Sequence, residues 1–376
     1  MISTRVFCEE LLRRGVDFFS GVPDSLLKDF CAYINSNLQK SSCVTAVNEG
    51  AAIALAAGYH LASNRIPLVF MQNSGLGNAL NPLLSLCDTD VYRIPALLLI
   101  GWRGEPGVRD EPQHITQGRL TCPLLETSGI PYLVMSDTED ALCRQLDTAF
   151  STMRSGGSPF ALIARKGLFE PWNPPPLENT LTMSREEAIE EVMLSSPQDL
   201  FFSTTGMASR ELYELREKHR LPHNRDFLTV GSMGHASSIA LGAALAKPHA
   251  RITCLDGDGA ALMHLGAFAS IGVLSPPNLR HIVLNNGAHD SVGGQPTAAF
   301  SIDLGAIARA CGYKHIYRAD TLQDLRQVLG KKRDGLEFIE VRVRRGSRPE
   351  LGRPKSSPLE NKTAFMTALN REEDSQ

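Results

Sequence analysis

The chain has 376 residues, of which 43% are hydrophobic and 21% are charged, and its formal net charge is −3. These proportions are typical of a globular protein, so they exclude a disordered, collagen-like or disulfide-stapled chain. The balanced charge, with no long run of one sign, argues against general nucleic-acid binding, which needs a concentrated basic surface. The length predicts two domains, or three at most.

Neither a membrane segment nor a disulfide framework is indicated. No apolar run approaches the ~20 residues that a membrane-spanning helix needs, and Glu9, Glu10, Arg13 and Arg14 interrupt any N-terminal signal core. The eight cysteines are scattered, without a C-x-x-C pair, and most lie in apolar stretches. We therefore expect reduced core thiols in a cytoplasmic protein.

Through residues 1–168, short apolar runs alternate with amphipathic stretches, which predicts a parallel α/β domain. The expected strands are residues 18–21, 43–47, 68–72, 96–100, 131–134 and 160–164. The expected helices are residues 4–14, 25–38, 49–63, 79–87 and 138–154.

Prolines crowd residues 169–183, which predicts an interdomain linker. The alternation restarts over residues 184–345. Strands are expected at 200–203, 252–255, 281–284 and 338–343, and helices at 185–194, 209–218, 236–246, 260–272, 302–311 and 322–329. Residues 346–376 form a polar tail, either loose or docked as one helix. The predicted fold is thus two doubly wound parallel-sheet domains of similar size.

The most specific motif lies in the second half. Gly257-Asp258-Gly259 closes one predicted strand and opens a helix, and Asn285-Asn286 closes the next strand. The interval between them is long enough for a helix, a turn and a returning parallel strand. Because the carboxyl ends of parallel strands share one sheet edge, we expect the two motifs to meet there.

These residues are suited to a metal–diphosphate site. Gly257 and Gly259 would let the backbone approach phosphate oxygens closely. Asp258 offers a carboxylate, Asn286 an amide oxygen and Ala288 a backbone carbonyl, an all-oxygen set that Mg²⁺ prefers. Either motif alone is equally compatible with an ordinary turn, so the interpretation depends on their spacing.

GDG followed at this interval by NN resembles the signature of thiamine diphosphate-dependent enzymes, and the domain order resembles the decarboxylases among them. The resemblance covers nearly the whole chain. It implies a pyrimidine-binding domain over residues 1–168, a diphosphate-binding domain over residues 184–345, and thiamine diphosphate with Mg²⁺ as cofactors. The middle domain of the larger decarboxylases and acetolactate synthases is missing here.

The same resemblance assigns roles to two further stretches. Glu49, in Val47-Asn48-Glu49-Gly50, would contact the aminopyrimidine ring and assist deprotonation of the cofactor. Met233, in the stretch that includes Gly231 and Ser232, would support the cofactor, with the Gly231 carbonyl directed at its exocyclic amine. The alternatives are a glutamate that begins a helix and a core methionine at a glycine-flanked turn.

The segments GVPDS, QNSGLGN, RGEPGVRDEPQH and GSMGHA resemble the two-domain members of the family, which act on phosphonopyruvate or sulfopyruvate. We expect cleavage of phosphonopyruvate to phosphonoacetaldehyde and CO₂, with sulfopyruvate as the alternative substrate. Asp24 is the candidate for proton handling, although it also reads as a helix N-cap. His114 is a second catalytic candidate, although a histidine in a loop is commonly a surface residue.

Other polar residues complete the expected site. Gln72, Asn73 and Ser74 follow a predicted strand and offer hydrogen bonds to cofactor or substrate. The Gly/Pro-punctuated segment 102–119 is interpreted as a lid whose Arg103, Arg109 or Arg119 binds the substrate anion.

Two other functions stay open at this point: a carboligase that joins two oxoacids, and a non-catalytic homologue that binds a nucleotide-like ligand. The resemblance also implies a homodimer or homotetramer in which Glu49 and Asp258 of one site come from different chains.

Overall fold

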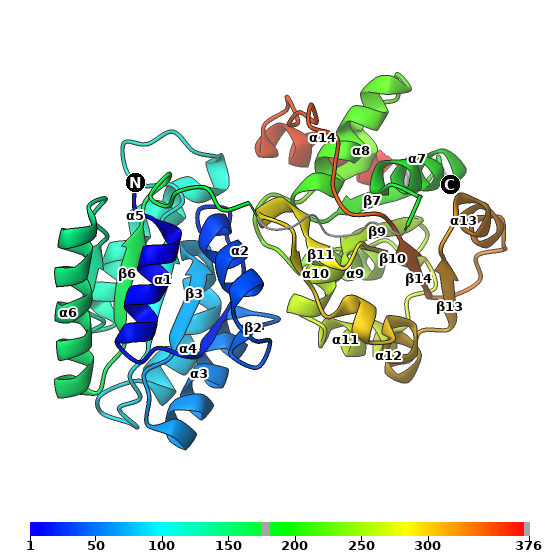
Figure 1. Ribbon diagram of the computed structural model, residues 1–376. Coiled ribbons are helices and arrows are strands. Elements are labelled where there is room, and N and C mark those ends of the chain that lie inside the picture. The colour runs from blue at the N-terminus through cyan, green and yellow to red at the C-terminus, as the bar shows by residue number, and fades with distance from the viewer. Residues whose placement is uncertain (174–180, 372–376) are drawn as a thin grey trace. The chain divides into compact units, whose positions relative to one another are not determined.

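A computed structural model describes residues 1–173 and 181–371 (Figure 1). The chain divides into two compact units, residues 1–176 and 177–376. Each unit is built around its own parallel six-stranded sheet.

The sheet of the first unit has the strand order β2-β1-β3-β4-β6-β5, with all pairs parallel. Its strands are β1 (Phe19–Gly21), β2 (Cys43–Thr45), β3 (Leu68–Gln72), β4 (Leu97–Gly101), β5 (Tyr132–Val134) and β6 (Phe160–Ala164). Its helices are α1 (Thr4–Arg13), α2 (Lys28–Asn37), α3 (Glu49–Ser63), α4 (Leu76–Leu86), α5 (Pro112–Thr127) and α6 (Glu139–Gly156), with a 3₁₀ turn, η1 (Asn73–Gly75).

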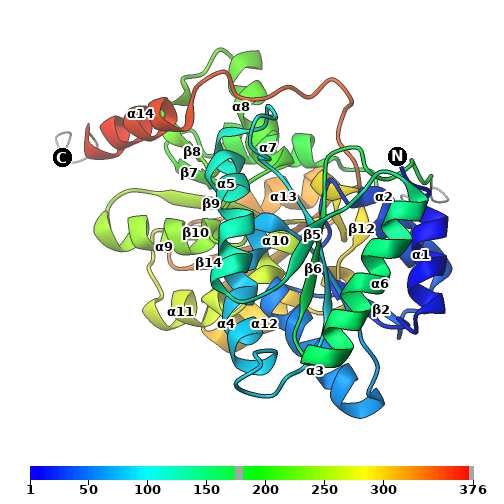
Figure 2. The same ribbon diagram turned by 90° about the vertical axis from the view of Figure 1, so that its left-hand side faces the viewer.

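Alternate residues of these strands face two separate cores, because side chains along a strand point to opposite faces. On β4, Leu97 and Leu99 pack with α1, α2 and α6, whereas Leu98 and Ile100 pack with α3, α4 and α5. The two groups of helices lie on opposite sides of the sheet (Figure 2).

The sheet of the second unit has the order β13-β14-β10-β9-β7-β8, again with all pairs parallel. Its strands are β7 (Leu200–Ser203), β8 (Asp226–Leu228), β9 (Ile252–Gly257), β10 (Leu279–Asn285), β13 (His315–Ala319) and β14 (Glu337–Arg342). A separate two-stranded ribbon pairs β11 (Ala288–His289) with β12 (Gln295–Pro296).

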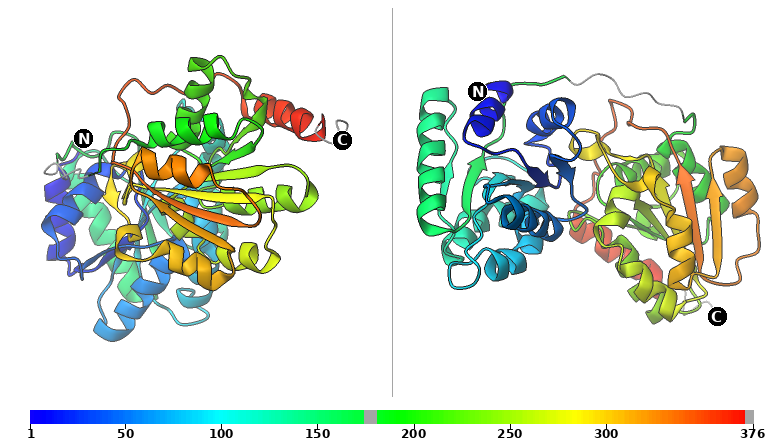
Figure 3. Two further views of the ribbon diagram at one scale, coloured as in Figure 1. Left: turned by 90° about the vertical axis from the view of Figure 1, so that its right-hand side faces the viewer. Right: turned by 60° about the horizontal axis from the view of Figure 1, so that its bottom comes forward.

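Helices cover both faces of this sheet as well (Figure 3). One face packs against α7 (Arg185–Ser195), α8 (Met207–Lys218) and α13 (Leu322–Leu329). The other packs against α9 (Ala236–Ala246), α10 (Asp258–Met263), α11 (Ala267–Leu274), α12 (Leu304–Cys311) and α14 (Pro358–Arg371). Short 3₁₀ turns are η2 (His223–Arg225), η3 (Asp290–Val292) and η4 (Ala299–Ser301).

The two sheets have the same topology. Numbered within its own unit, each sheet runs 2-1-3-4-6-5, so the chain reverses direction across the sheet between its first and third strands. Ligands of open parallel sheets bind outside the carboxyl ends of the strands at such a reversal. The fold therefore directs attention to β1 and β3 in the first unit and to β7 and β9 in the second.

Most predicted elements are confirmed, but several expectations were wrong. The predicted helix 260–272 is two helices, α10 and α11, and the predicted helix 25–38 begins only at Lys28. The edge strands β8 and β13 were not predicted. Helix α5 was not predicted either, so much of the proposed lid is helical, and the loop before it packs closely: a Cβ on Gly118 would lie 1.7 Å from the Gly104 carbonyl oxygen.

Of the predicted linker, residues 174–180 lie outside the described residues. Before them, Phe169 is buried in the first core and forms a bridge with Ile2. After them, Met183 is buried in the core beneath α7. Both ends of the proline-rich stretch are thus packed against their own units.

Within its described residues, the polar tail contains a docked helix, one of the two outcomes expected for it. Phe365 of α14 packs against Phe202 of β7 with ring centroids 5.0 Å apart. The side chain of Asn361 completes the edge strand β8: its Nδ2 donates to the Asp226 carbonyl (2.8 Å), and its Oδ1 accepts from the Leu228 N–H (3.1 Å). Figure 2 shows α14 beside β8.

All eight cysteines are free thiols in the structure. Within residues 1–173 and 181–371, no helix combines the length and the apolar character needed to cross a bilayer.

We predict that Asn361→Ala lowers the free energy of unfolding by about 2 kcal/mol, because it leaves two buried backbone groups of β8 without a partner. Urea denaturation measures the change. Thr363→Ala is the matched control, since Thr363 is exposed on the same helix. Equal stability of the two variants would contradict the capping role of Asn361.

Candidate active site

The two predicted motifs meet at the carboxyl edge of the second sheet. Strand β9 ends at Gly257 and α10 begins at Asp258, while β10 ends at Asn285. The parallel register pairs Leu284 with Gly257. Asp258 directly follows Gly257, and Asn286 comes two residues after Leu284, so both leave the sheet at the same edge, as their spacing in the sequence predicts.

Asp258 is a buried acid, with 3% of its surface exposed. Burial raises its pKa from the usual 3.8 to about 6, although hydrogen bonds from the Thr297 hydroxyl and from the backbone N–H groups of Gly259 and Asn286 oppose the shift. No ion pair joins Asp258 to a basic side chain within the described residues. A carboxyl group desolvated in this way, without a cation, is suited to binding one.

The two asparagines have different contacts. Asn285 is fully buried and anchors the turn: its Nδ2 donates to Glu340 Oε1 (2.8 Å), and its Oδ1 accepts from the Gly287 N–H (3.1 Å). Asn286 lines the pocket described next. Its Oδ1 accepts from the Ala288 N–H (3.0 Å), which leaves one lone pair of that oxygen for a ligand.

A pocket opens at this edge, and it contains most of the residues predicted for the diphosphate and metal. Of the predicted set it is lined by Met233, Gly257, Asp258, Gly259, Asn286 and Ala288. The sequence analysis missed other lining residues, among them Arg185, Thr204, Thr205, His289, Asp290 and Ser291. Thr204 and Thr205 directly follow β7, where the chain reverses direction across the sheet. Their position at a strand end could have indicated them as ligand-binding candidates.

Gly259 lies where a side chain would fill the pocket. A Cβ there would come within 2.7 Å of His289 Cε1 and 3.5 Å of Met233 Cε. Burial lowers the pKa of His289 to about 4, so its imidazole is neutral at physiological pH. Gly231 and Ser232 are in the turn before Met233, where both have positive φ angles, 71° and 22°, and neither is among the residues that line the pocket.

These residues fit a magnesium-bound diphosphate. Asp258, Asn286 and the Ala288 carbonyl would supply the oxygen ligands that Mg²⁺ prefers. The hydroxyl groups of Thr204 and Thr205 and the open backbone of Gly259 would face the phosphate oxygens.

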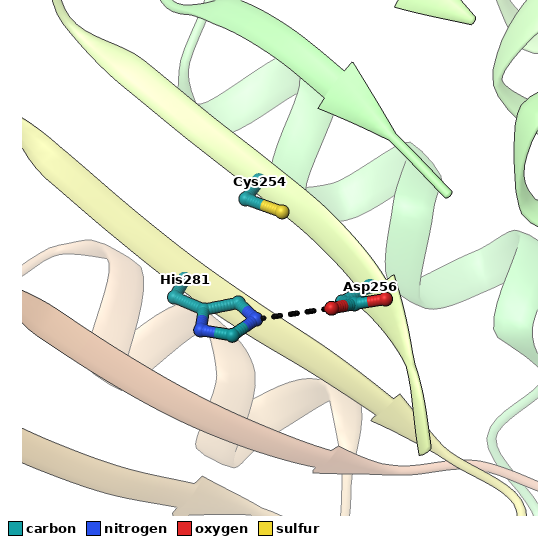
Figure 4. Close-up of side chains that lie close together, drawn as sticks. All are labelled: Cys254, Asp256 and His281. Atoms are coloured by element: carbon teal, nitrogen blue, oxygen red, sulfur yellow. Dashed lines mark hydrogen bonds and ion pairs between the residues drawn. The ribbon is translucent and has the colours of Figure 1, made fainter. Parts of the chain in front are cut away.

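A second cluster of metal-binding residue types adjoins the pocket, and its Asp256 is one of the pocket-lining residues. Cys254, Asp256 and His281 are fully buried on adjacent strands (Figure 4). His281 Nε2 lies 3.4 Å from Asp256 Oδ2 and Nδ1 lies 3.0 Å from the Tyr313 hydroxyl, so both ring nitrogens are engaged. Burial raises the pKa of the Cys254 thiol well above its usual value.

Asp256 also accepts a hydrogen bond from the Gly257 N–H (2.9 Å). The Asp256–His281 contact joins the two strands whose ends carry Asp258 and Asn286. The Asp256–Gly257 contact fixes the backbone at the start of the Gly257-Asp258-Gly259 turn.

In the first unit, Glu49 is the first residue of α3, and Asn48 caps the helix by accepting from the Ala51 N–H (2.8 Å). The Glu49 carboxylate is buried and accepts from Asn78 Nδ2 (2.9 Å). A Cβ on Gly75 would lie 2.5 Å from Glu49 Oε1, so only glycine leaves room for this carboxylate. Glu49 thus begins a helix and also lies near the edge of the first sheet at which the chain reverses direction between β1 and β3.

Gln72, Asn73 and Ser74 lie at the end of β3 and in η1. Gln72 Nε2 donates to Ser74 Oγ (2.6 Å). Asn73 is buried, and its Nδ2 donates to the Arg103 carbonyl (2.8 Å) and to Thr121 Oγ1 (2.9 Å). Both N–H groups of Asn73 therefore donate to other groups of the same unit. Of the three residues, Gln72 and Ser74 are the more available for hydrogen bonds to a ligand.

Asp24 follows β1 and is completely buried. The N-cap residue of α2 is Leu27, so the alternative interpretation of Asp24 as a helix N-cap is wrong. The Asp24 carboxylate accepts from the Leu26 N–H (3.1 Å) instead. Burial raises its pKa to about 6, against the opposing charge of Arg103. A Cβ on Gly101 would lie 1.9 Å from Asp24 Oδ2.

His114 is on helix α5, not in a loop, and it is buried. Its Nδ1 has no hydrogen-bond partner among the described residues. Burial, followed by the charge of Arg103, lowers its pKa to about 4. Asp24 and His114 thus share one charged neighbour in the first unit.

Arg103 is the most enclosed arginine of the segment predicted as a lid, but Asp110 occupies its guanidinium with contacts of 2.8 and 2.5 Å, and Ser25 accepts from Nη1 at 2.9 Å. Arg109 and Arg119 are exposed.

The comparisons with known proteins agree with this geometry. Residues 2–121 match the family model of the thiamine pyrophosphate enzyme N-terminal TPP binding domain, and residues 204–341 match that of the C-terminal TPP binding domain. The chain therefore belongs to the thiamine pyrophosphate enzymes, and the cofactor expected from the sequence is confirmed at the level of the family.

Within this family, the chain is 37% identical over 369 residues to a phosphonopyruvate decarboxylase of Streptomyces viridochromogenes, covering 92% of this chain and 89% of the relative. It is 35% identical to a phosphonopyruvate decarboxylase of Streptomyces hygroscopicus, covering 96% and 92%. A sulfopyruvate decarboxylase of Methanosarcina acetivorans is 29% identical, with 96% of both chains covered.

We predict that Asp24→Asn raises the free energy of unfolding at pH 8, by up to about 3 kcal/mol, because each unit of pKa shift corresponds to about 1.4 kcal/mol. A carboxyl whose pKa is higher in the folded protein costs stability once it ionises. The gain should therefore be largest above pH 6 and shrink as the pH falls from 6 toward 3.8. Urea titrations at several pH values measure it, with the exposed Asp140→Asn as control. A pH-independent difference would contradict the burial argument.

Proposed function

We propose that the protein is a Mg²⁺- and thiamine diphosphate-dependent decarboxylase that converts phosphonopyruvate to phosphonoacetaldehyde and CO₂. The observation that carries the proposal is the meeting of Asp258 and Asn286 at one pocket on the edge of the second sheet. Two relatives that match almost the entire chain at 37% and 35% identity are named phosphonopyruvate decarboxylases.

When bound, thiamine diphosphate supplies the carbon nucleophile and accepts the electrons that CO₂ leaves behind. The residues of this chain hold it and move protons. Asp258, Asn286 and the Ala288 carbonyl bind the Mg²⁺, and Met233 supports the cofactor from the same pocket. Glu49, whose second oxygen accepts from Asn78, keeps its other oxygen for a ring nitrogen of the cofactor.

On the substrate side, Asp24 is the proton donor of the proposed reaction. A carboxyl with a pKa of about 6 can carry a proton near neutral pH and still release it. His114 offers a neutral imidazole with an unoccupied Nδ1. Arg103, already paired with Asp110, sets the charge around both residues.

Sulfopyruvate is the second candidate substrate, because a relative that matches 96% of the chain is named sulfopyruvate decarboxylase. Both substrates are 2-oxoacids with a compact oxyanion, so the same residues would serve either.

We predict that the purified protein, with thiamine diphosphate and Mg²⁺, releases CO₂ and an aldehyde from phosphonopyruvate faster than from sulfopyruvate or pyruvate. Parallel assays of the three acids, with product identification, measure this preference. A preference for sulfopyruvate would move the assignment to the second candidate. An acyloin or acetolactate product would show a carboligase instead.

Two variants serve as controls for this assay. Asp258→Ala should lose cofactor binding, whereas Glu49→Gln should bind the cofactor and lose turnover, because the amide cannot exchange a proton with the ring. Isothermal titration with thiamine diphosphate and Mg²⁺ separates the two effects. Full activity of Glu49→Gln would overturn the proposed role of Glu49.

The active form is proposed to be at least a homodimer. Helices α4, α9 and α11 contain no charged residue. Large apolar side chains are exposed on these helices and on α3, including Leu61 of α3 (73%) and Val273 of α11 (82%). Exposed apolar surface of this kind is typical of protein interfaces, and a second copy of the chain is the partner that the family resemblance implies.

If each site combines Glu49 of one chain with Asp258 of another, mixed Glu49→Ala and Asp258→Ala subunits should recover activity. Random re-association gives hybrids with one intact site, or about a quarter of the wild-type activity. Sedimentation of the wild type gives the oligomeric state, and each variant alone is the control. An active monomer, or a mixture as inactive as its parts, would contradict this assembly.

A further inference from the structure

Asp290 is one of the residues that line the pocket, four residues after Asn286, and no motif in the sequence indicates it. It is the first residue of η3, and its side chain is mostly buried, with 11% exposed. The same oxygen, Oδ2, accepts hydrogen bonds from three separate parts of the second unit: Asn286 Nδ2 (2.6 Å), Arg185 Nη1 (3.0 Å) and the Gly346 N–H (3.0 Å).

The contact with Asn286 determines which end of that amide faces the pocket. An asparagine amide has an oxygen that can bind a cation and an NH₂ group that repels one. A carboxylate accepts only from the NH₂ end, so this end of the Asn286 amide is turned toward Asp290. The amide oxygen, also held by the Ala288 N–H, is thereby kept on the other side.

Asp290 is itself held by a buried ion network. Arg185, the first residue of α7, makes a two-point contact with Glu211 of α8 (2.7 and 2.9 Å) and uses its remaining nitrogen for Asp290. The side chains of Arg185 and Glu211 are 8% and 2% exposed. Charge-assisted contacts of this kind have restricted geometry, so they limit the movement of Asp290.

The chain after β14 completes the network. Gly346 donates its N–H to Asp290, and two residues later Arg348 pairs with Glu186 of α7 and with Glu214 of α8. The segment that leads to α14 is therefore fastened over the same helices that hold Asp290.

We propose that Asp290 is a positioning residue that orients the Asn286 amide oxygen toward the divalent cation. This inference rests on the proposed function, since the cation is the one bound with the diphosphate. Residues that orient a metal ligand commonly change metal affinity by about 10- to 100-fold when they are removed. Asp290 is not proposed to contact a reacting group; it acts through Asn286.

The test is Mg²⁺ affinity, measured by calorimetry in the full-length protein with saturating thiamine diphosphate. Asp290→Ala should weaken Mg²⁺ binding by about 10-fold or more. Asp290→Asn should weaken it less, because its amide oxygen can still accept from Asn286. Glu337→Gln is the matched control: it removes the negative charge from another buried ion pair, Glu337–Arg280 (2.6 Å), at the start of β14 and β10. It should lower the melting temperature and leave Mg²⁺ affinity unchanged.

The outcomes separate this inference from the proposed function. Wild-type Mg²⁺ affinity in a folded Asp290→Ala protein would overturn the role of Asp290 and leave the decarboxylase proposal intact. If Asp290→Ala does not fold, unchanged Mg²⁺ affinity in Asp290→Asn would overturn it in the same way. A weakened affinity in Glu337→Gln equal to that in the Asp290 variants would reduce Asp290 to a stabilising role. A wild-type protein that bound neither Mg²⁺ nor thiamine diphosphate would overturn the proposed function itself.

Discussion

The parallel pairing of β9 with β10 is the constraint on which the second unit's site depends. Gly257 lies opposite Leu284, so Asp258, one residue further on, and Asn286, two residues further on, leave the sheet at the same edge. A shift of this register by one residue would turn every side chain of the strand to the other face. The buried contact of Asp256 with His281 across the two strands opposes such a shift. The contact of Asn285 with Glu340 in turn holds the end of β10 against β14. The interior of the sheet thus fixes the geometry at its edge.

Much of the fold could be predicted because buried parallel strands are continuous apolar runs, as in Leu97–Gly101. The failures occurred where other forces decide. Strand β13 is partly exposed, and β8 has three residues and is completed by the side chain of Asn361 from a distant helix. Helix α5 contains Gly118 and internal Pro123, which are helix-breaking signals in a sequence, but Gly118 is where the backbone of the preceding loop packs closely.

The residues of the candidate site also fall into two groups, those that a local motif indicates and those that only tertiary packing brings to the site. Asp258, Asn286 and Glu49 could be found because each belongs to a short motif at a strand end. Arg185 and Asp290 could not, since their contact joins residues far apart in the chain and depends on the packing of α7 and η3. Asn73 shows a different limit of sequence reasoning: its position after a strand predicts a ligand-binding amide, and the structure adds that its N–H groups donate to the Arg103 carbonyl and to Thr121 of helix α5. Local sequence shows where a polar side chain begins, and tertiary packing determines where its hydrogen bonds go.

The two units use one topology for opposite electrostatic tasks. In the second, a buried carboxyl has no basic partner among the described residues, an environment that would favour the proposed cation. In the first, burial raises the pKa of Asp24 and lowers that of His114, which shifts both toward their neutral forms, while Asp110 offsets the charge of Arg103. A substrate carboxylate held by a strong cation would be stabilised before it is lost as CO₂, which would slow the reaction. A nearly neutral cluster at the proposed substrate site would avoid this stabilisation, as suits a reaction whose leaving group is an uncharged gas.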